Sequence, residues 1–105
     1  MNIDFKTELL KDLFLGKAKG KQKFSQEVLT QYKKKVKILR RIKSTTELYK
    51  FKGLHFEKFK HGRFKGKHSI RLNDQFRLIF ERIKEIQNKK VIELLLINEI
   101  SKHYE

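Results

Sequence analysis

The chain has 105 residues, with 27 Lys and Arg against 12 Asp and Glu, and its formal net charge at pH 7 is +15. It contains no cysteine, which excludes a disulfide scaffold, a thiolate zinc site and a thiol nucleophile. Hydrophobic residues make up 38% of the chain, enough for the core of one domain over residues 1–105.

The first half of the chain predicts helices after a short strand. Ile3 and Phe5 indicate the strand, and the apolar residues within 9–14 indicate a short helix. From Ser25, a plausible N-cap, apolar residues recur with helical spacing as far as Ile42, and Lys and Arg residues occupy the other side. We therefore expect a long amphipathic helix here.

A capping box follows. Ser44 and Glu47 have the spacing that predicts a short helix, which ends near Phe51 before Gly53. After Gly53 the period changes from helical to alternating, and residues 54–58 are expected to form a strand.

The remaining strands form a meander. Residues 68–72 and 76–81 alternate between apolar and polar, and the tight connection at 73–75 makes them an antiparallel hairpin. Residues 91–97 predict a strand buried on both faces, reached across the polar segment 84–90. Helices followed by such a sheet indicate an α+β fold.

The charge surplus attracts polyanions, so RNA, DNA, an anionic membrane surface or an acidic protein are candidate partners. The longest uninterrupted apolar stretch, residues 94–97, is far shorter than a membrane span, and no signal-peptide segment is visible. We expect a cytoplasmic protein without a membrane partner.

The segment at residues 65–81 reads Lys-Gly-Lys-His-Ser-Ile-Arg-Leu-Asn-Asp-Gln-Phe-Arg-Leu-Ile-Phe-Glu. It resembles the central hairpin of the RelE/ParE superfamily of bacterial type II toxin–antitoxin toxins, closest to the HigB branch. Segments 54–58 and 97–105 also resemble their family counterparts. The resemblance implies helices packed on a small, mostly antiparallel sheet, with a HigA-like antitoxin as partner. It also implies a ribosome-dependent mRNA endonuclease, whereas ParE members inhibit DNA gyrase instead.

Metal-free RNA cleavage needs a base, an acid and cations that hold the charge developing on the phosphate. Histidine suits the first two roles because its ordinary pKa is about 6.5. The resemblance implies that His55 and His103 form the acid/base pair, in either order, and that Arg77 is the catalytic arginine. Lys58, three residues after His55, is a further charge-stabilising candidate or a solvated strand residue.

Tyr104 is a candidate for base stacking or proton transfer. The family often has an acidic residue and a tyrosine just before the terminal histidine, where this chain has Ser101 and Lys102. His61 lies in a turn-like stretch and is expected at the surface, whereas His68 alternates with apolar residues and is expected against the core.

Arg77 also has a structural interpretation, since it can pair with Glu81 or Glu93 across the sheet. The four histidines match no zinc-binding spacing, so we expect no metal and no cofactor.

Two basic regions are expected to bind RNA phosphates, each contact adding a salt-dependent increment. One is a helix face and the other is the stretch between the predicted strands. Their residues are Lys33, Lys34, Lys37, Arg40 and Arg41 on the helix, and Lys60, Arg63, Lys65 and Lys67 in the stretch. With Lys58, they would dock the protein on ribosomal RNA.

Our leading hypothesis is therefore an mRNA endonuclease toxin that inhibits translation, with the ribosome, mRNA and an antitoxin as partners. The alternatives are a gyrase inhibitor of ParE type and a basic nucleic-acid-binding module with a degenerate site.

Overall fold

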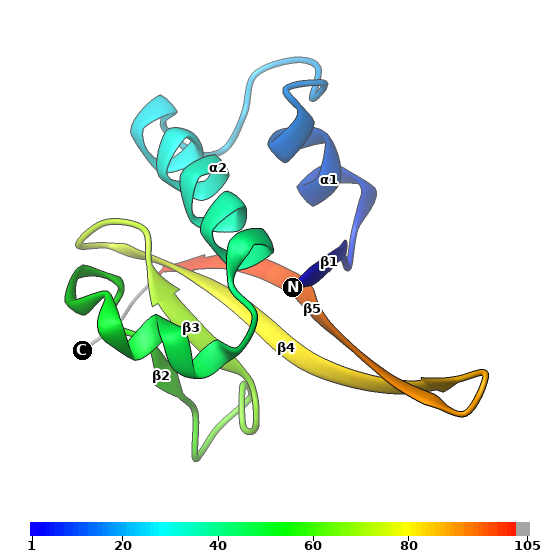
Figure 1. The fold of residues 1–105 in the computed structure, drawn as a ribbon. Coiled ribbons are helices and arrows are strands. Elements are labelled where there is room, and N and C mark those ends of the chain that lie inside the picture. The colour runs from blue at the N-terminus through cyan, green and yellow to red at the C-terminus, as the bar shows by residue number, and fades with distance from the viewer. Residues whose placement is uncertain (103–105) are drawn as a thin grey trace.

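The computed structural model describes residues 1–102, and it combines helices with one five-stranded sheet (Figure 1). The predicted α+β class is confirmed. In chain order the elements are β1 (Asn2–Phe5), α1 (Glu8–Leu15), α2 (Gln26–Arg41), the 3-10 helices η1 (Thr45–Lys50) and η2 (Lys52–Leu54), β2 (Glu57–Lys58), β3 (His68–Arg71), β4 (Phe76–Gln87) and β5 (Lys90–Lys102).

The long helix α2 begins where the sequence predicts. The Ser25 hydroxyl accepts a hydrogen bond from the backbone N–H of Val28 (3.2 Å) and caps the first turn. The Tyr32 hydroxyl donates to the carbonyl of Leu10 (2.7 Å), which ties α2 to α1. The buried residues of α2 have the predicted helical spacing: Val28, Leu29, Tyr32, Val36 and Leu39.

The predicted capping box is also present, although the helix that it starts is of the 3-10 type. The Glu47 carboxylate accepts hydrogen bonds from the backbone N–H groups of Lys43 (2.6 Å) and Ser44 (2.9 Å). Both bonds lower the pKa of Glu47, the one from Ser44 more than the one from Lys43, because they stabilise the charged carboxylate.

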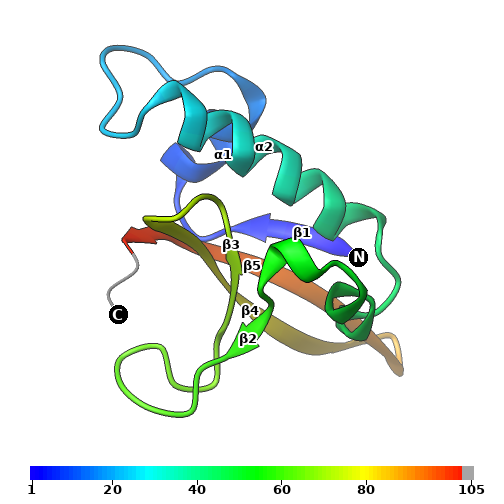
Figure 2. The same ribbon diagram turned by 90° about the vertical axis from the view of Figure 1, so that its left-hand side faces the viewer.

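The strands run in the order β1-β5-β4-β3-β2, with antiparallel neighbours except for the parallel pair of β1 and β5. Figures 1 and 2 show α1 and α2 together on one side of this sheet. The core lies between them, where Leu39 of α2 and Phe80 and Ile97 of the sheet are fully buried. The helices thus leave the other side of the sheet uncovered.

The strand register assigns each sheet residue to one of two faces, because directly paired residues point to the same side. The helix face contains a row formed by Lys58, His68, Phe80 and Ile97. On the opposite face no helix packs, and we call it the bare face for that reason, although Ser69 and Ile79 are buried in it. It contains the other residues of the pairs: Glu57, Ser69, Arg71, Arg77, Ile79, Glu99 and Ser101.

The strand expected at residues 54–58 is shorter than predicted. Leu54 is buried in η2, and His55 has a left-handed backbone with φ of 46°, so pairing begins only at Glu57. The alternation of Leu54 and Phe56 resembles a strand, but both side chains pack inward from a turning segment.

The polar segment at 84–90 was predicted as a connection, and this prediction is wrong. β4 continues to Gln87, and a two-residue turn at Asn88 and Lys89 leads directly into β5. Both turn residues have positive φ, 50° and 64°, as a type I′ hairpin requires. The result is a two-stranded extension of residues 82–93, the arm, which projects from the body (Figure 1).

The expected burial of residues 91–97 on both faces is correct only for part of the strand. Leu95 and Ile97 are fully buried on the helix face, while Leu94 and Leu96 are half-buried. Val91 is 68% exposed because it lies in the arm, beyond the reach of the helices.

Candidate active site

Arg77 lies on the bare face at the start of β4, and its side chain is partly buried. Its Nη1 donates hydrogen bonds to the carbonyl oxygens of Asn73 (2.6 Å) and Phe76 (3.1 Å). The pairing with Glu81 or Glu93 that the sequence allowed is absent among the described contacts, since Glu93 pairs instead with Arg82. The guanidinium is therefore held by neutral carbonyls, which leaves its charge available to an anion.

Arg71 of β3 lies directly opposite Arg77. Like charges at such positions, with Cβ atoms about 5 Å apart, destabilise a sheet. Arg71 forms an ion pair with Asp74, which is highly exposed in the turn. Arg71 is not among the site residues predicted from the sequence. The hairpin predicted at residues 68–81 already implied this pairing. Asp74 is its central residue, so Arg71 and Arg77, three residues before and after it, must lie opposite each other.

The electrostatics of this pair favour an anion. Burial, and then the neighbouring Arg71, lower the pKa of Arg77, whereas Glu57 and Asp74 act in the opposite direction. An arginine still keeps its charge at neutral pH. A phosphate bound at this pair would relieve the remaining repulsion and accept hydrogen bonds from both arginines.

The other predicted catalytic residues are placed as follows. His55 is exposed, on the left-handed turn before β2. Lys58 is exposed and pairs with His68, so the register puts it on the helix face and separates it from Arg77. Ser101 is paired with Arg77, and β5 ends one residue later. His103 and Tyr104 lie outside the described residues.

The two remaining histidines are placed as predicted. His61 is exposed. His68 is 8% exposed and packs against the rings of Phe56 and Phe80, with centroid distances of 5.4 and 5.7 Å, while these two rings also contact each other. Its Nδ1 is buried without a hydrogen-bond partner. Burial, followed by the charges of Lys58 and Arg82, lowers the pKa of His68. Within residues 1–102, no three His, Cys, Asp or Glu side chains gather where they could hold a metal ion.

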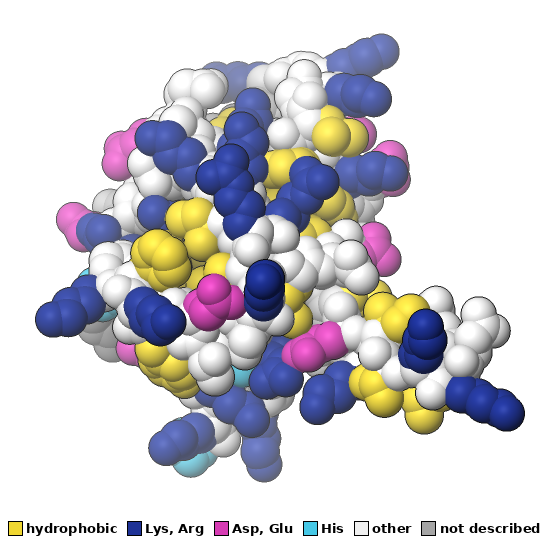
Figure 3. Space-filling view, in the orientation of Figure 1, with side chains coloured by type: hydrophobic (Ala, Val, Ile, Leu, Met, Phe, Trp, Pro, Cys, Tyr) yellow, Lys and Arg dark blue, Asp and Glu magenta, His cyan; other side chains and the backbone are white. Residues whose placement is uncertain are grey.

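The predicted RNA-binding residues of the helix form one surface on α2. We call this set the α2 basic face: Lys33, Lys34, Lys37, Arg40 and Arg41. Lys33 is half-buried and the other four are exposed. Figure 3 shows Lys and Arg side chains gathered over α2.

The predicted RNA-binding residues between the strands follow β2. Lys60, Arg63 and Lys65 are exposed, and Lys67 is half-buried. Arg63 lies 4.1 Å from the ring centroid of Phe64 and pairs with Glu99 of the bare face (2.8 Å). This connection therefore reaches the face that carries Arg71 and Arg77.

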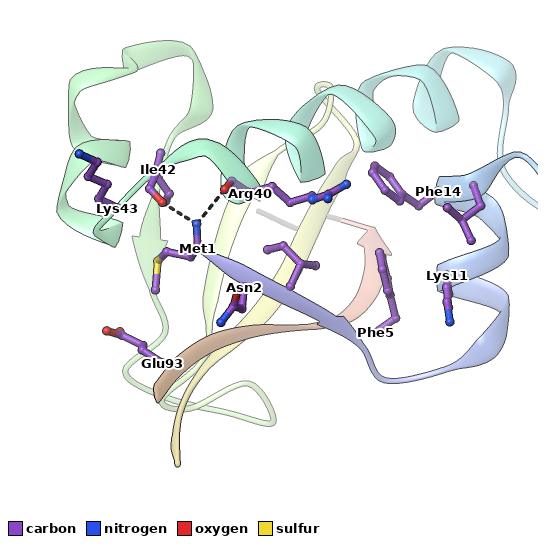
Figure 4. A pocket seen from close by; sticks show the side chains of 11 residues that line it. Met1, Asn2, Phe5, Lys11, Phe14, Arg40, Ile42, Lys43 and Glu93 are labelled. Atoms are coloured by element: carbon purple, nitrogen blue, oxygen red, sulfur yellow. Dashed lines mark hydrogen bonds between the residues drawn. The ribbon is translucent and has the colours of Figure 1, made fainter. Parts of the chain in front are cut away.

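A hollow of about 940 Å³ lies between α1, β1 and the C-terminal end of α2 (Figure 4). Its lining includes Phe5, Phe14 and Arg40, and the Met1 ammonium donates hydrogen bonds to the carbonyls of Arg40 (2.8 Å) and Ile42 (2.5 Å). Apart from Arg40, none of the predicted site residues lines it. The hollow is therefore distinct from the bare-face arginines.

None of the helices in the described part of the chain is long and apolar enough to cross a membrane.

The arrangement of helices and sheet is that of a small bacterial toxin fold, which confirms the fold that the hairpin motif implied. Among solved structures, the YoeB/ParE toxin from Agrobacterium tumefaciens has a TM-score of 0.59 and 15% sequence identity, over 99% of this chain and 100% of that chain. No protein-family model and no curated protein matches the sequence. At this identity the likeness shows a shared fold, and the HigB branch stays a prediction.

Proposed function

We propose that the protein is the toxin of a type II toxin–antitoxin module and cleaves messenger RNA on ribosomes in the cytoplasm. The pairing of Arg71 with Arg77 on the bare face carries this proposal. Two arginines at paired positions, Arg77 held by backbone carbonyls and Arg71 by Asp74, are suited to a single RNA phosphate. The toxin fold supports the same conclusion.

The proposed reaction begins when a base removes the proton of an RNA 2′-OH. The 2′ oxygen then bonds to the adjacent phosphorus, the bond from phosphorus to the 5′ oxygen breaks, and an acid protonates the departing oxygen. The products are a 2′,3′-cyclic phosphate and a 5′-OH. Arg77, with Arg71, stabilises the charge on the phosphate, and His55 and His103 are the proposed base and acid. Tyr104 remains a sequence-based candidate, and so does Lys58, although the register puts Lys58 on the face opposite Arg77.

The α2 basic face is proposed to dock on ribosomal RNA, because phosphate contacts supply affinity without sequence preference. The antitoxin, proposed to be HigA-like, would present acidic or apolar surface that covers or distorts the site.

Inducible expression followed by mapping of message 5′ ends tests the proposal. Wild type is expected to arrest growth and create new 5′ ends, whereas Arg77→Ala and His103→Ala are expected to do neither. Growth arrest without new 5′ ends would overturn the nuclease proposal and favour gyrase as the target. Absence of arrest in wild type would favour a basic binding module.

A further inference from the structure

Two aromatic rings are exposed on the segment formed by η1 and η2. The exposed fraction is 64% for Tyr49 and 49% for Phe51. Lys50 and Lys52 alternate with these rings in the sequence, and both lysines are exposed. Residues 48–56 contain no acidic residue. Rings interleaved with cations are the combination that proteins use to bind single-stranded nucleic acid.

Tyr49 is attached to the core through a cluster of rings. Its ring packs in a T-shaped arrangement against Phe56, with centroids 4.8 Å apart. Phe56, His68 and the fully buried Phe80 all stack on one another, with centroids 5.4–6.2 Å apart. The ring cluster restricts the Tyr49 ring before any ligand arrives. A ring held in this way loses little conformational freedom when a base stacks on it.

The local charge indicates the kind of ligand. Lys58, on the same face as His68, adds a third exposed cation near the ring cluster. The nearest acidic residue along the chain before Tyr49 is Glu47, whose carboxylate already accepts two backbone hydrogen bonds. An apolar peptide would leave these lysines without partners, whereas a nucleotide offers both a phosphate and a flat base.

An unpaired base is required, because the bases of a duplex are already stacked on one another. We propose that Tyr49, Lys50, Phe51 and Lys52 bind an unpaired nucleotide of single-stranded RNA. Arg71 and Arg77 lie on the bare face, whereas the ring cluster lies on the helix face. The proposed surface therefore excludes these arginines, although His55 of the proposed active site follows it three residues after Lys52. RNA binding there does not depend on cleavage.

The test uses the full chain and two fluorescently labelled oligomers of equal length. One is 2′-O-methyl oligouridine, which cannot be cleaved by attack of a 2′-OH, and the other is its abasic counterpart. By fluorescence anisotropy, wild type is expected to bind the base-bearing oligomer more tightly. Tyr49→Ala should weaken that binding about 5- to 150-fold, which corresponds to about 1–3 kcal/mol for one stacked base, and should leave abasic binding unchanged.

Matched variants separate stacking from folding and from charge. Tyr49→Phe, which keeps the ring, should bind within about twofold of wild type, and Tyr49→Leu, which keeps apolar packing, should resemble Tyr49→Ala. Lys50→Ala with Lys52→Ala should weaken both oligomers, and Ile86→Ala, on the exposed arm, should weaken neither. Circular dichroism checks the fold of each variant.

Two outcomes would overturn the proposal. One is equal binding of the base-bearing and abasic oligomers by wild type. The other is wild-type affinity for the base-bearing oligomer in both Tyr49→Leu and Phe51→Ala. A third outcome would also count against RNA: polyglutamate displaces the oligomer from wild type, and Tyr49→Ala weakens the binding of polyglutamate as much as it weakens the binding of the oligomer. The surface would then bind an acidic protein segment instead of RNA. None of these outcomes involves cleavage. Loss of the proposed nucleotide site would therefore leave the proposed nuclease function standing, and loss of the nuclease function would leave the nucleotide site standing.

Discussion

Arg71 and Arg77 face each other across β3 and β4, on the side of the sheet that the helices leave uncovered. Arg77 donates hydrogen bonds to two backbone carbonyls. Burial lowers the pKa of Arg77 most, and the charge of the neighbouring Arg71 lowers it further. Asp74 and Glu57 offset part of the repulsion between the two arginines. We propose that a phosphate binds at this pair and offsets the remainder.

Removing one of these charges should reduce the salt dependence of RNA binding. A single-stranded RNA contact contributes about 0.7 to the slope of log affinity against log salt. Arg71→Gln should therefore lower the slope by about 0.7, measured with 2′-O-methyl oligouridine from 50 to 200 mM salt. Arg82→Gln, which removes an arginine paired with Glu93 in the arm, is the control. Equal slopes for Arg71→Gln and wild type would count against a phosphate contact.

Reversing charge on α2 should weaken association with ribosomes. Replacing Lys33, Lys34 and Lys37 by Glu is expected to lower ribosome binding at least tenfold at low salt, in a sedimentation assay, because phosphate contacts are lost and repulsion is added. The control reverses Lys84, Lys89 and Lys90 in the arm, with the same change of net charge. Equal losses in the two triple variants would mean that total charge, and not the α2 basic face, determines docking.

His68 should make stability depend on pH. Its folded pKa is lowered, mainly by burial, and then by Lys58 and Arg82. The unfolded chain, with a pKa near 6.5, therefore binds the proton more readily, and the free energy of unfolding should fall as pH decreases from about 6.5 towards the folded value. Urea unfolding between pH 8 and 5 measures this fall.

His68→Phe keeps the stacked rings and should remove this part of the pH dependence, whereas His61→Ala, at an exposed position, should retain it. An unchanged pH dependence in His68→Phe would contradict the assignment of this effect to His68.

The turn of the arm offers a test of backbone strain. Lys89 has φ of 64°, which costs free energy for any residue with a Cβ and little for glycine. Lys89→Gly should raise the free energy of unfolding by about 0.5–1 kcal/mol, and Lys89→Val should lower it. Chemical denaturation measures both, and the opposite order of stability would rule out the proposed turn strain.

Local signals predicted most of the fold. Ser25 and the apolar spacing after it define α2, and residues 73–75 define the β3–β4 hairpin, because caps and tight turns act over a few residues. The arm was not predicted because residues 84–90 are mostly polar. A two-stranded ribbon that is exposed on both sides shows no alternation of apolar and polar residues.

The site was only partly predictable for a similar reason. Arg77 follows from the hairpin motif, but the face that each residue occupies depends on pairing between distant strands. Sequence proximity grouped Lys58 with His55, whereas the pairing of Lys58 with His68 puts it on the opposite face from Arg77. The exposure of Tyr49 depends likewise on how η1 packs, which its local sequence does not specify.

The most direct test of ribosome-dependent mRNA cleavage is an assay of a labelled message on purified ribosomes, with analysis of the fragment ends. The proposed function predicts cleavage only when ribosomes are present, with a 5′-OH on the downstream fragment. It also predicts a rate at least about 100-fold lower in Arg77→Ala, as expected for loss of a charge-stabilising donor, and an unchanged rate in Arg82→Ala. An intact message with wild-type protein, a 5′-phosphate on the fragment, or an undiminished rate in Arg77→Ala would contradict it.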